Sequence, residues 1–160
     1  VMFSAVFLTA ATGAVYFGAR GFLFDVHDTY SDVSVDFSMY DIKDTIEEVY
    51  RLPEGCGYEF VDETFKNIVV NSEYKAGDKT INLSQYTKTF ALNLMMNTEN
   101  SEVYEIEVNG ETGFVLTYRS NNFDNLIAVM WVHNGYVFEI TGAFVGKDEL
   151  LMLAELVEMK

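Results

Sequence analysis

Three kinds of residue are scarce in this chain, and each shortage narrows what the protein can be. The 160 residues include one cysteine, Cys56, so neither an internal disulfide nor a cysteine-rich metal site can form. Proline also occurs once, at Pro53, and with Gly55 just after it this residue marks a turn. Ten Lys and Arg against 25 Asp and Glu leave a net charge of -15. Because so acidic a body repels phosphate backbones, we expect no nucleic-acid partner.

Motifs of known catalytic chemistry are missing as well. The sequence has no phosphate-binding glycine loop, no HExxH motif and no Gly-x-Ser-x-Gly motif. The two histidines, His27 and His133, lie in no sequence context that pairs them with a nucleophile. Asp25, Asp28 and Asp32 beside His27 indicate a solvated face, since no tight glycine loop is present to fold oxygen ligands around an ion. We therefore predict a protein that is not an enzyme, with no catalytic residue, no cofactor and no metal site.

What the chain does contain is enough apolar sequence for one folded domain. Hydrophobic residues make up 49% of it and aromatic residues 15%, which excludes intrinsic disorder. Residues 1–19 carry no charge, and a helix of about twenty apolar residues matches the roughly 30 Å thickness of a bilayer core. We predict an apolar, transmembrane helix over residues 1–20 and a single domain over residues 21–160. A cleaved signal peptide and a helix buried in the domain are the alternatives for the first segment.

The scarcity of Lys and Arg after this first segment predicts which side of the membrane the domain occupies. Loops on the cytoplasmic side are usually enriched in both residues. We therefore expect the domain on the extracytoplasmic side of the cell membrane.

Alternation of apolar and polar residues predicts a sheet through most of the domain. Strands are expected at residues 33–40, 56–61, 68–74, 80–88, 102–108, 112–119, 126–133 and 136–141. Asn109-Gly110 and Asn134-Gly135 each separate two such runs, and Asn-Gly is the pair that a type I′ hairpin turn favours. Two such hairpins predict an antiparallel sheet.

Helices are expected near both ends of the domain. Phe22, Val26 and Thr29 share one helical face, which predicts that a helix continues over residues 20–33. Leu150, Leu153, Ala154 and Val157 form an apolar stripe in residues 147–159. Since residues 126–132 are apolar on both faces, this last helix should cover one face and something further the other. The predicted class is α+β: an antiparallel meander sheet, a C-terminal helix packed on one face and an N-terminal apolar helix.

Aromatic side chains are the one positive sign of a binding surface. Several of them cluster in or beside the meander, and this set is our candidate ligand or partner surface: Tyr86, Phe90, Tyr104, Tyr118, Phe123, Trp131 and Tyr136. The structural alternative is that they are core residues and cross-strand pairs.

Several short segments, spread in order over almost the whole chain, resemble an uncharacterised family of bacterial domains, mostly Gram-positive, that follow a single membrane helix. The matching segments are Ala19-Arg20-Gly21-Phe22, Phe24 to Tyr30, Leu52-Pro53-Glu54-Gly55, Ile81 to Gln85, Asn97 to Asn100, Val108-Asn109-Gly110, Met130-Trp131, Asn134 to Phe138 and Lys147 to Leu150. The chain departs from the family pattern at Cys56-Gly57, which interrupts the usual Gly-Tyr after the Pro-Glu pair and puts the local turn geometry in doubt. The resemblance implies the outer half of a membrane protein, whose cytoplasmic half in some members is similar to an anti-sigma factor. It implies no catalytic residues.

These observations predict a membrane-tethered sensing or interaction domain in envelope signalling, which binds a protein or peptide at the cell envelope. The alternative function is a small-molecule or lipid-binding module that uses the apolar second face of residues 126–132. A hydrolase is a more distant third. The sequence leaves the identity of the ligand and the oligomeric state open.

Overall fold

The computed structural model describes residues 22–26, 31–35, 40–91, 94–96, 102–118 and 126–160. The elements in chain order are β1 (Phe22–Val26), β2 (Ser31–Val35), β3 (Tyr50–Arg51), β4 (Glu59–Lys66), β5 (Val69–Ala76), β6 (Lys79–Tyr86), α1 (Lys88–Ala91), β7 (Leu94–Met96), β8 (Glu102–Val108), β9 (Glu111–Tyr118), β10 (Leu126–His133), β11 (Tyr136–Ala143), α2 (Lys147–Leu156) and β12 (Glu158–Met159).

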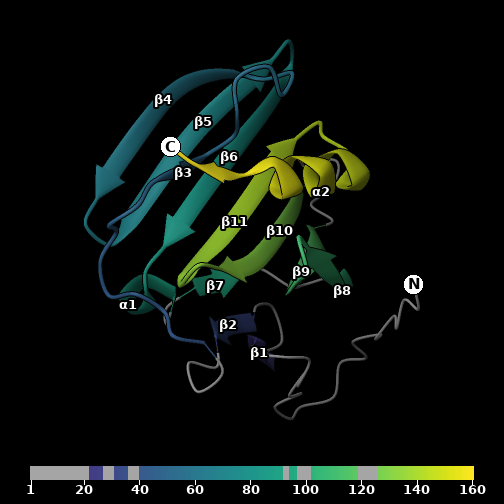
Figure 1. The fold of residues 1–160 in the computed structure, drawn as a ribbon. Helices are drawn as coiled ribbons and strands as arrows, with labels where there is room; N and C mark the ends of the chain where they lie inside the picture. The colour runs from purple at the N-terminus through teal and green to yellow at the C-terminus, as the bar shows by residue number, and fades with distance from the viewer. Residues whose placement is uncertain (1–21, 27–30, 36–39, 92–93, 97–101, 119–125) are drawn as a thin grey trace.

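A seven-stranded antiparallel sheet forms the body of the domain (Figure 1). Its order, β4-β5-β6-β11-β10-β9-β8, joins two meanders through the pairing of β6 with β11. Both predicted Asn-Gly hairpins are confirmed: Asn109 and Asn134 have φ of 51° and 48°, and the glycines after them 85° and 78°. The predicted antiparallel sheet with a C-terminal helix is therefore confirmed.

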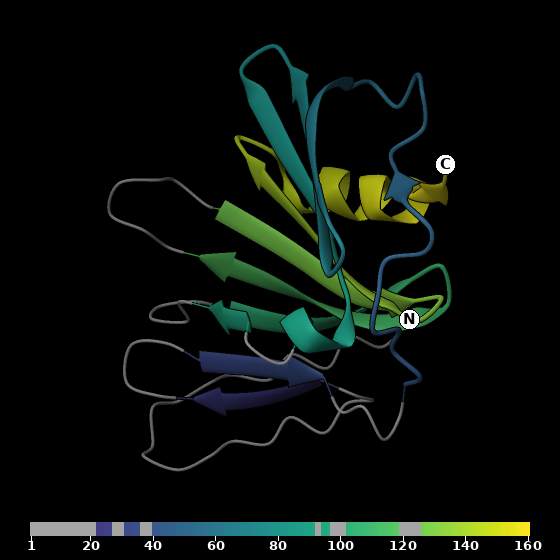
Figure 2. The ribbon, with the colours of Figure 1, turned by 90° about the vertical axis from the view of Figure 1, so that its left-hand side faces the viewer.

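Helix α2 packs on one face of β10 and β11 (Figure 2). Leu150, Leu153 and Ala154 of this helix join Trp131 and Phe138 in a first core cluster. Gly142 of β11 allows the close approach, since a Cβ there would lie 2.8 Å from that of Val145.

The other face of the same strands carries a second core cluster. Ala128, Met130 and Val132 pack there with Phe114 and Leu116. A smaller sheet, in the order β1-β2-β7, lies on the opposite side of β10 and β11 from α2 in both views (Figures 1 and 2).

The predicted helix over residues 20–33 is wrong, because β1 and β2 pair there as antiparallel strands. Phe22, Phe24 and Val26 also alternate with a period of two, so the pattern fits either structure, and aromatic and β-branched residues favour the strand. Strand β2 begins two residues before the predicted strand at residues 33–40, and residues 36–39 lie outside the described residues.

Two further boundaries differ from the prediction. The strand expected at residues 56–61 is β4, which starts later because Gly55 and Gly57 keep the chain in a turn with φ of 83° and 94°. The last helix ends at Leu156 because Val157 is extended, with φ of -60° and ψ of 124°, and β12 then pairs with β3.

Two short elements, the end of α1 and strand β7, lie between the predicted strands at residues 80–88 and 102–108. No helix among the described residues is both long and apolar enough to cross a bilayer, and the segment of residues 1–20 lies outside them.

Candidate functional site

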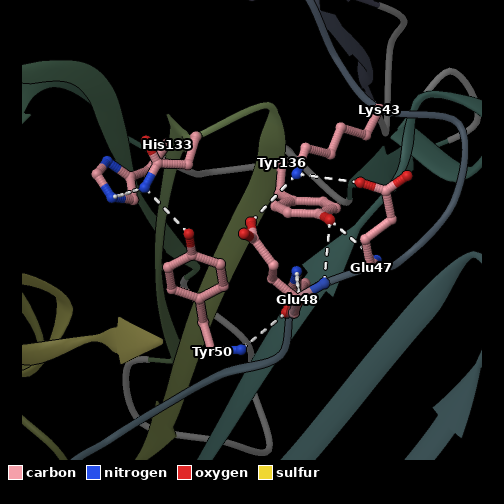
Figure 3. Close-up of polar contacts among 8 residues, drawn as sticks. Lys43, Glu47, Glu48, Tyr50, His133 and Tyr136 are labelled. Atoms are coloured by element: carbon pink, nitrogen blue, oxygen red, sulfur yellow. Dashed lines mark hydrogen bonds and ion pairs between the residues drawn. The ribbon is translucent and has the colours of Figure 1, made fainter. Parts of the chain in front are cut away.

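A strap, residues 41–52, crosses the face of the sheet that α2 also covers, and buried side chains hold its backbone (Figure 3). The Tyr136 hydroxyl accepts hydrogen bonds from the backbone N–H groups of Glu47, at 3.0 Å, and Glu48, at 3.3 Å. The Tyr136 ring is fully buried in the first core cluster. Its oxygen therefore has a fixed position, and the strap is fixed with it.

Gln85 of β6 acts on the strap as a peptide group would. Its Nε2 donates to the carbonyl oxygen of Glu48 at 2.8 Å, and its Oε1 accepts from the backbone N–H of Tyr50 at 3.1 Å. Gln85 is 1% exposed, so both bonds satisfy an amide that would otherwise be costly to bury. The Tyr74 hydroxyl accepts from the backbone N–H of Leu52 at 3.1 Å and completes the attachment.

Lys43 joins the strap to the β10–β11 turn. Its backbone N–H donates to the carbonyl oxygen of Gly135 at 2.8 Å. Its ammonium lies 3.1 Å from the Glu48 carboxylate, 3.5 Å from that of Glu47 and 4.9 Å from the centre of the Tyr136 ring (Figure 3). The hydrogen bond to Glu48 raises the pKa of Lys43 above its ordinary value, so this side chain stays cationic.

The turn residue Asn134 links the strap to β10. Its Nδ2 donates to the Tyr50 hydroxyl at 3.0 Å and lies 2.9 Å from Nε2 of His133 (Figure 3). The imidazole nitrogen accepts this second bond in the tautomer that carries its proton on Nδ1. The ring of Tyr50 also meets that of His133 edge to face at 6.0 Å.

These contacts form one wall of an open groove with a volume of about 700 Å³. The chain end, from Val157 to Met159, forms another. The lining residues are Asp41, Lys43, Glu48, Tyr50, His133, Asn134, Gly135, Val157, Glu158 and Met159. The lining thus contains three carboxylates and one ammonium, and among these described residues no serine, threonine or cysteine supplies a nucleophile.

The opposite face of the sheet carries a smaller, polar hollow of about 200 Å³, lined by Asp62, Thr64, Asn71, Ser72, Glu73 and Asn82. On the same face the Tyr86 hydroxyl donates to the Glu139 carboxylate at 2.6 Å. Burial raises the pKa of Glu139, and this bond only partly opposes the shift. The pair lies beside the second core cluster, away from the groove.

The predicted aromatic surface is divided between both faces of the sheet. Tyr86 lies in the second core cluster, whereas Trp131 and Tyr136 lie in the first, and all three rings are buried. Tyr104 on β8 is half-buried, with the Lys147 ammonium 5.0 Å from its ring centre. The remaining three lie where the structure describes no side chain: Phe90, Tyr118 and Phe123. Of the seven, Tyr136 alone among those with described side chains holds the strap, and none of those is a lining residue of the groove.

Sequence reasoning missed the strap and its holder, Gln85. A signal was present, because Ile81, Leu83 and Gln85 follow one another with a period of two. A polar residue in the apolar phase of a strand predicts a buried amide with a specific partner. Lys43 and Glu48 had no comparable signal.

Residues 47–157 match the family model described as "Domain of unknown function (DUF4367)". The chain belongs to the DUF4367 family. The matched range begins within the strap and extends through both meanders to the end of α2, so it contains Tyr136, Gln85 and most of the groove. No curated protein and no solved structure matches the chain.

Proposed function

We propose that this DUF4367 domain is a non-enzymatic association module, and that its groove binds an extended, positively charged segment of a partner protein at the cell envelope. The charge of the groove carries the proposal. Asp41, Glu48 and Glu158 line it, and Asp41 and Glu158 are exposed. Since Glu48 is occupied by Lys43, the other two carboxylates are the ones that meet a cationic ligand. Small molecules usually bind in enclosed pockets that bury most of their surface. An open groove is better suited to a polypeptide, which can enter it from the side.

The proposal places the domain at the outer face of a membrane, tethered by residues 1–20. Two sequence features support this arrangement: residues 1–19 are uncharged, and basic residues are scarce after them. In this role the domain carries an envelope signal by association alone, as its resemblance to domains linked to anti-sigma-like proteins suggests.

The lipid-binding alternative needs space on the second face of β10. Ala128 and Met130 on that face are both 0% exposed, so no cavity of the size of a water molecule touches them. This observation favours the association module.

The test compares two peptides of ten residues, one rich in lysine and one rich in glutamate, titrated into isotope-labelled full chain in detergent and followed by NMR. We expect the lysine peptide to shift the amide resonances of His133, Asn134 and Met159, and the glutamate peptide to leave them unchanged. The double variant Asp41→Asn, Glu158→Gln should weaken binding by roughly 2- to 30-fold, because each exposed ion pair contributes about 0.2–1 kcal/mol.

A matched control removes the same charge elsewhere. Asp78 and Glu105 are exposed and lie outside the groove, so the variant Asp78→Asn, Glu105→Gln should bind as the parent does. Equal weakening in both double variants would show that net charge, and not the groove, attracts the peptide. Copurification of a lipid with the chain, without peptide binding, would favour the alternative.

A further inference from the structure

Strand β4 is an outer strand of the seven-stranded sheet, and no other described strand pairs with its outer edge (Figure 1). It presents apolar side chains to solvent. Phe60, Val61 and Phe65 are 49%, 46% and 52% exposed. The strand is eight residues long, and unpaired N–H and C=O groups on such an edge are a template for another strand. This edge lies apart from the groove.

A bulge in β4 decides which of its side chains share a face. Phe60 pairs with Tyr74 and Asp62 with Glu73, so Val61 has no partner in the ladder. Residues five apart in a regular strand lie on opposite faces, but the extra residue brings Phe60 and Phe65 to the same face. By the same count Glu59 and Lys66 share the other face. The strand therefore has seven ladder positions, and Glu63 is the middle one.

We infer that β4 pairs with β4 of a second copy of this chain, antiparallel, about a two-fold axis at Glu63. In this register Glu59 faces Lys66 of the other copy and Phe60 faces Phe65, and each contact occurs twice. Opposite charges and aromatic rings are both favourable cross-strand pairs. The two-fold axis makes the interface closed, because the same strand serves both sides.

The register is selected by the sequence of the strand itself. Shifting the axis to Asp62 places Phe60 opposite Glu63, and shifting it to Thr64 places Phe65 opposite Glu63. Only the axis at Glu63 satisfies the aromatic and the charged pairs together. An unrelated peptide has no reason to offer this pattern, so the strand is best matched by its own copy.

The two Glu63 side chains that meet on the axis are already neutralised. The Arg51 guanidinium donates to this carboxylate from Nε at 2.7 Å and from Nη2, and the Ser72 hydroxyl donates at 3.0 Å. Arg51 also lies 5.1 Å from the centre of the Phe60 ring, which holds that ring in place. The like charges at the centre therefore repel each other little.

Carbodiimide crosslinking of the full chain in a mild detergent tests the register directly. Glu59 and Lys66 lie about 23 Å apart along one strand, so a direct amide between them cannot form within one copy. We expect a Glu59–Lys66 crosslink, and in a mixture of isotope-labelled and unlabelled chain it should join one of each. Its absence at concentrations where the chain is dimeric would overturn the inference.

A second experiment reverses the charges of Glu59 and Lys66, first singly and then together, and measures the mass of the chain in solution by sedimentation. Glu59→Lys and Lys66→Glu should each weaken self-association by about tenfold or more, since like charges then face each other at both ends. The double variant should restore it. Glu105→Lys on β8, at the opposite edge of the sheet, is the control and should leave the mass unchanged. If the chain is a monomer at all concentrations, or if the single reversals leave dimer formation unchanged, β4 is not the interface. Circular dichroism checks that each variant is folded.

Discussion

Removing one oxygen atom from Tyr136 should loosen the strap while leaving the core intact. Tyr136→Phe keeps the ring, which is fully buried against Tyr50 and Phe138. The backbone N–H groups of Glu47 and Glu48 lose their acceptor. Each such bond contributes about 0.5–1.5 kcal/mol. Because the strap is only partly buried, water can replace part of the lost hydrogen bonding. We therefore expect the free energy of unfolding to fall by about 1–2 kcal/mol in total.

The assay for Tyr136→Phe is urea unfolding together with amide hydrogen exchange. The midpoint should fall while the slope m stays constant, because the surface exposed on unfolding is unchanged. The amides of Glu47, Glu48 and Tyr50 should exchange faster than the loss of global stability alone explains. The exchange rates of the β11 amides should change only as much as global stability changes.

Tyr86→Phe is the matched control for this prediction. Its hydroxyl donates to Glu139 on the opposite face and has no role in holding the strap. The strap amides should therefore keep their parent exchange rates, measured relative to global stability. If Tyr136→Phe leaves both the midpoint and the strap amides unchanged, the tyrosine hydroxyl does not hold the strap, and our account of the groove wall is wrong.

Three further predictions concern packing and pH. Gly142→Ala should lower the free energy of unfolding by about 1–3 kcal/mol, since the new methyl group meets Val145 and Leu150, whereas Gly146→Ala enters open space and should be near neutral; urea unfolding measures both. Burial raises the pKa of Glu139, so its favourable contribution is present below the unfolded pKa and is lost as the pH rises through the folded value. Glu139→Gln should therefore stabilise the chain at pH 8 and change little at pH 4 in thermal unfolding. The pKa of Glu63 is lowered by Arg51, and that of Glu149 by Lys79, so their contributions are lost as the pH falls below about 4.5 through the folded values. Glu63→Gln should accordingly reduce the loss of stability between pH 5 and pH 2.

Local signals explain which parts of the fold the sequence predicted. The hairpins at Asn109 and Asn134 follow from two adjacent residues that tolerate positive φ. Helix α2 follows from an apolar stripe with acidic residues in its first turn. The edge strand β4 was predicted only in part, because its exposed second half lacks the alternation that burial imposes.

The strap was beyond the reach of local patterns. Its backbone is held by Tyr136 and Gln85, which are separated from their partners by 88 or 89 and by 35 or 37 positions. A segment whose hydrogen bonds run to distant side chains has no periodicity of its own. The only local sign of such a partner is that Gln85 occupies a position that the alternation of β6 predicts to be buried. The pairing of β6 with β11 is non-local in the same way.

The position of the short strand β3 connects the two surfaces proposed here. Tyr50 lines the groove, and the next residue, Arg51, holds Glu63 at the centre of the β4 edge. The partner of β3 is β12, so a ligand that contacts Glu158 also bears on the ladder that fixes Arg51. A segment bound in the groove and a second copy bound at β4 would therefore both act on β3, through its two residues Tyr50 and Arg51. Because binding free energies at coupled sites are reciprocal, lysine-peptide affinity should change with chain concentration, and the charge reversal Lys66→Glu should abolish that change without altering the groove.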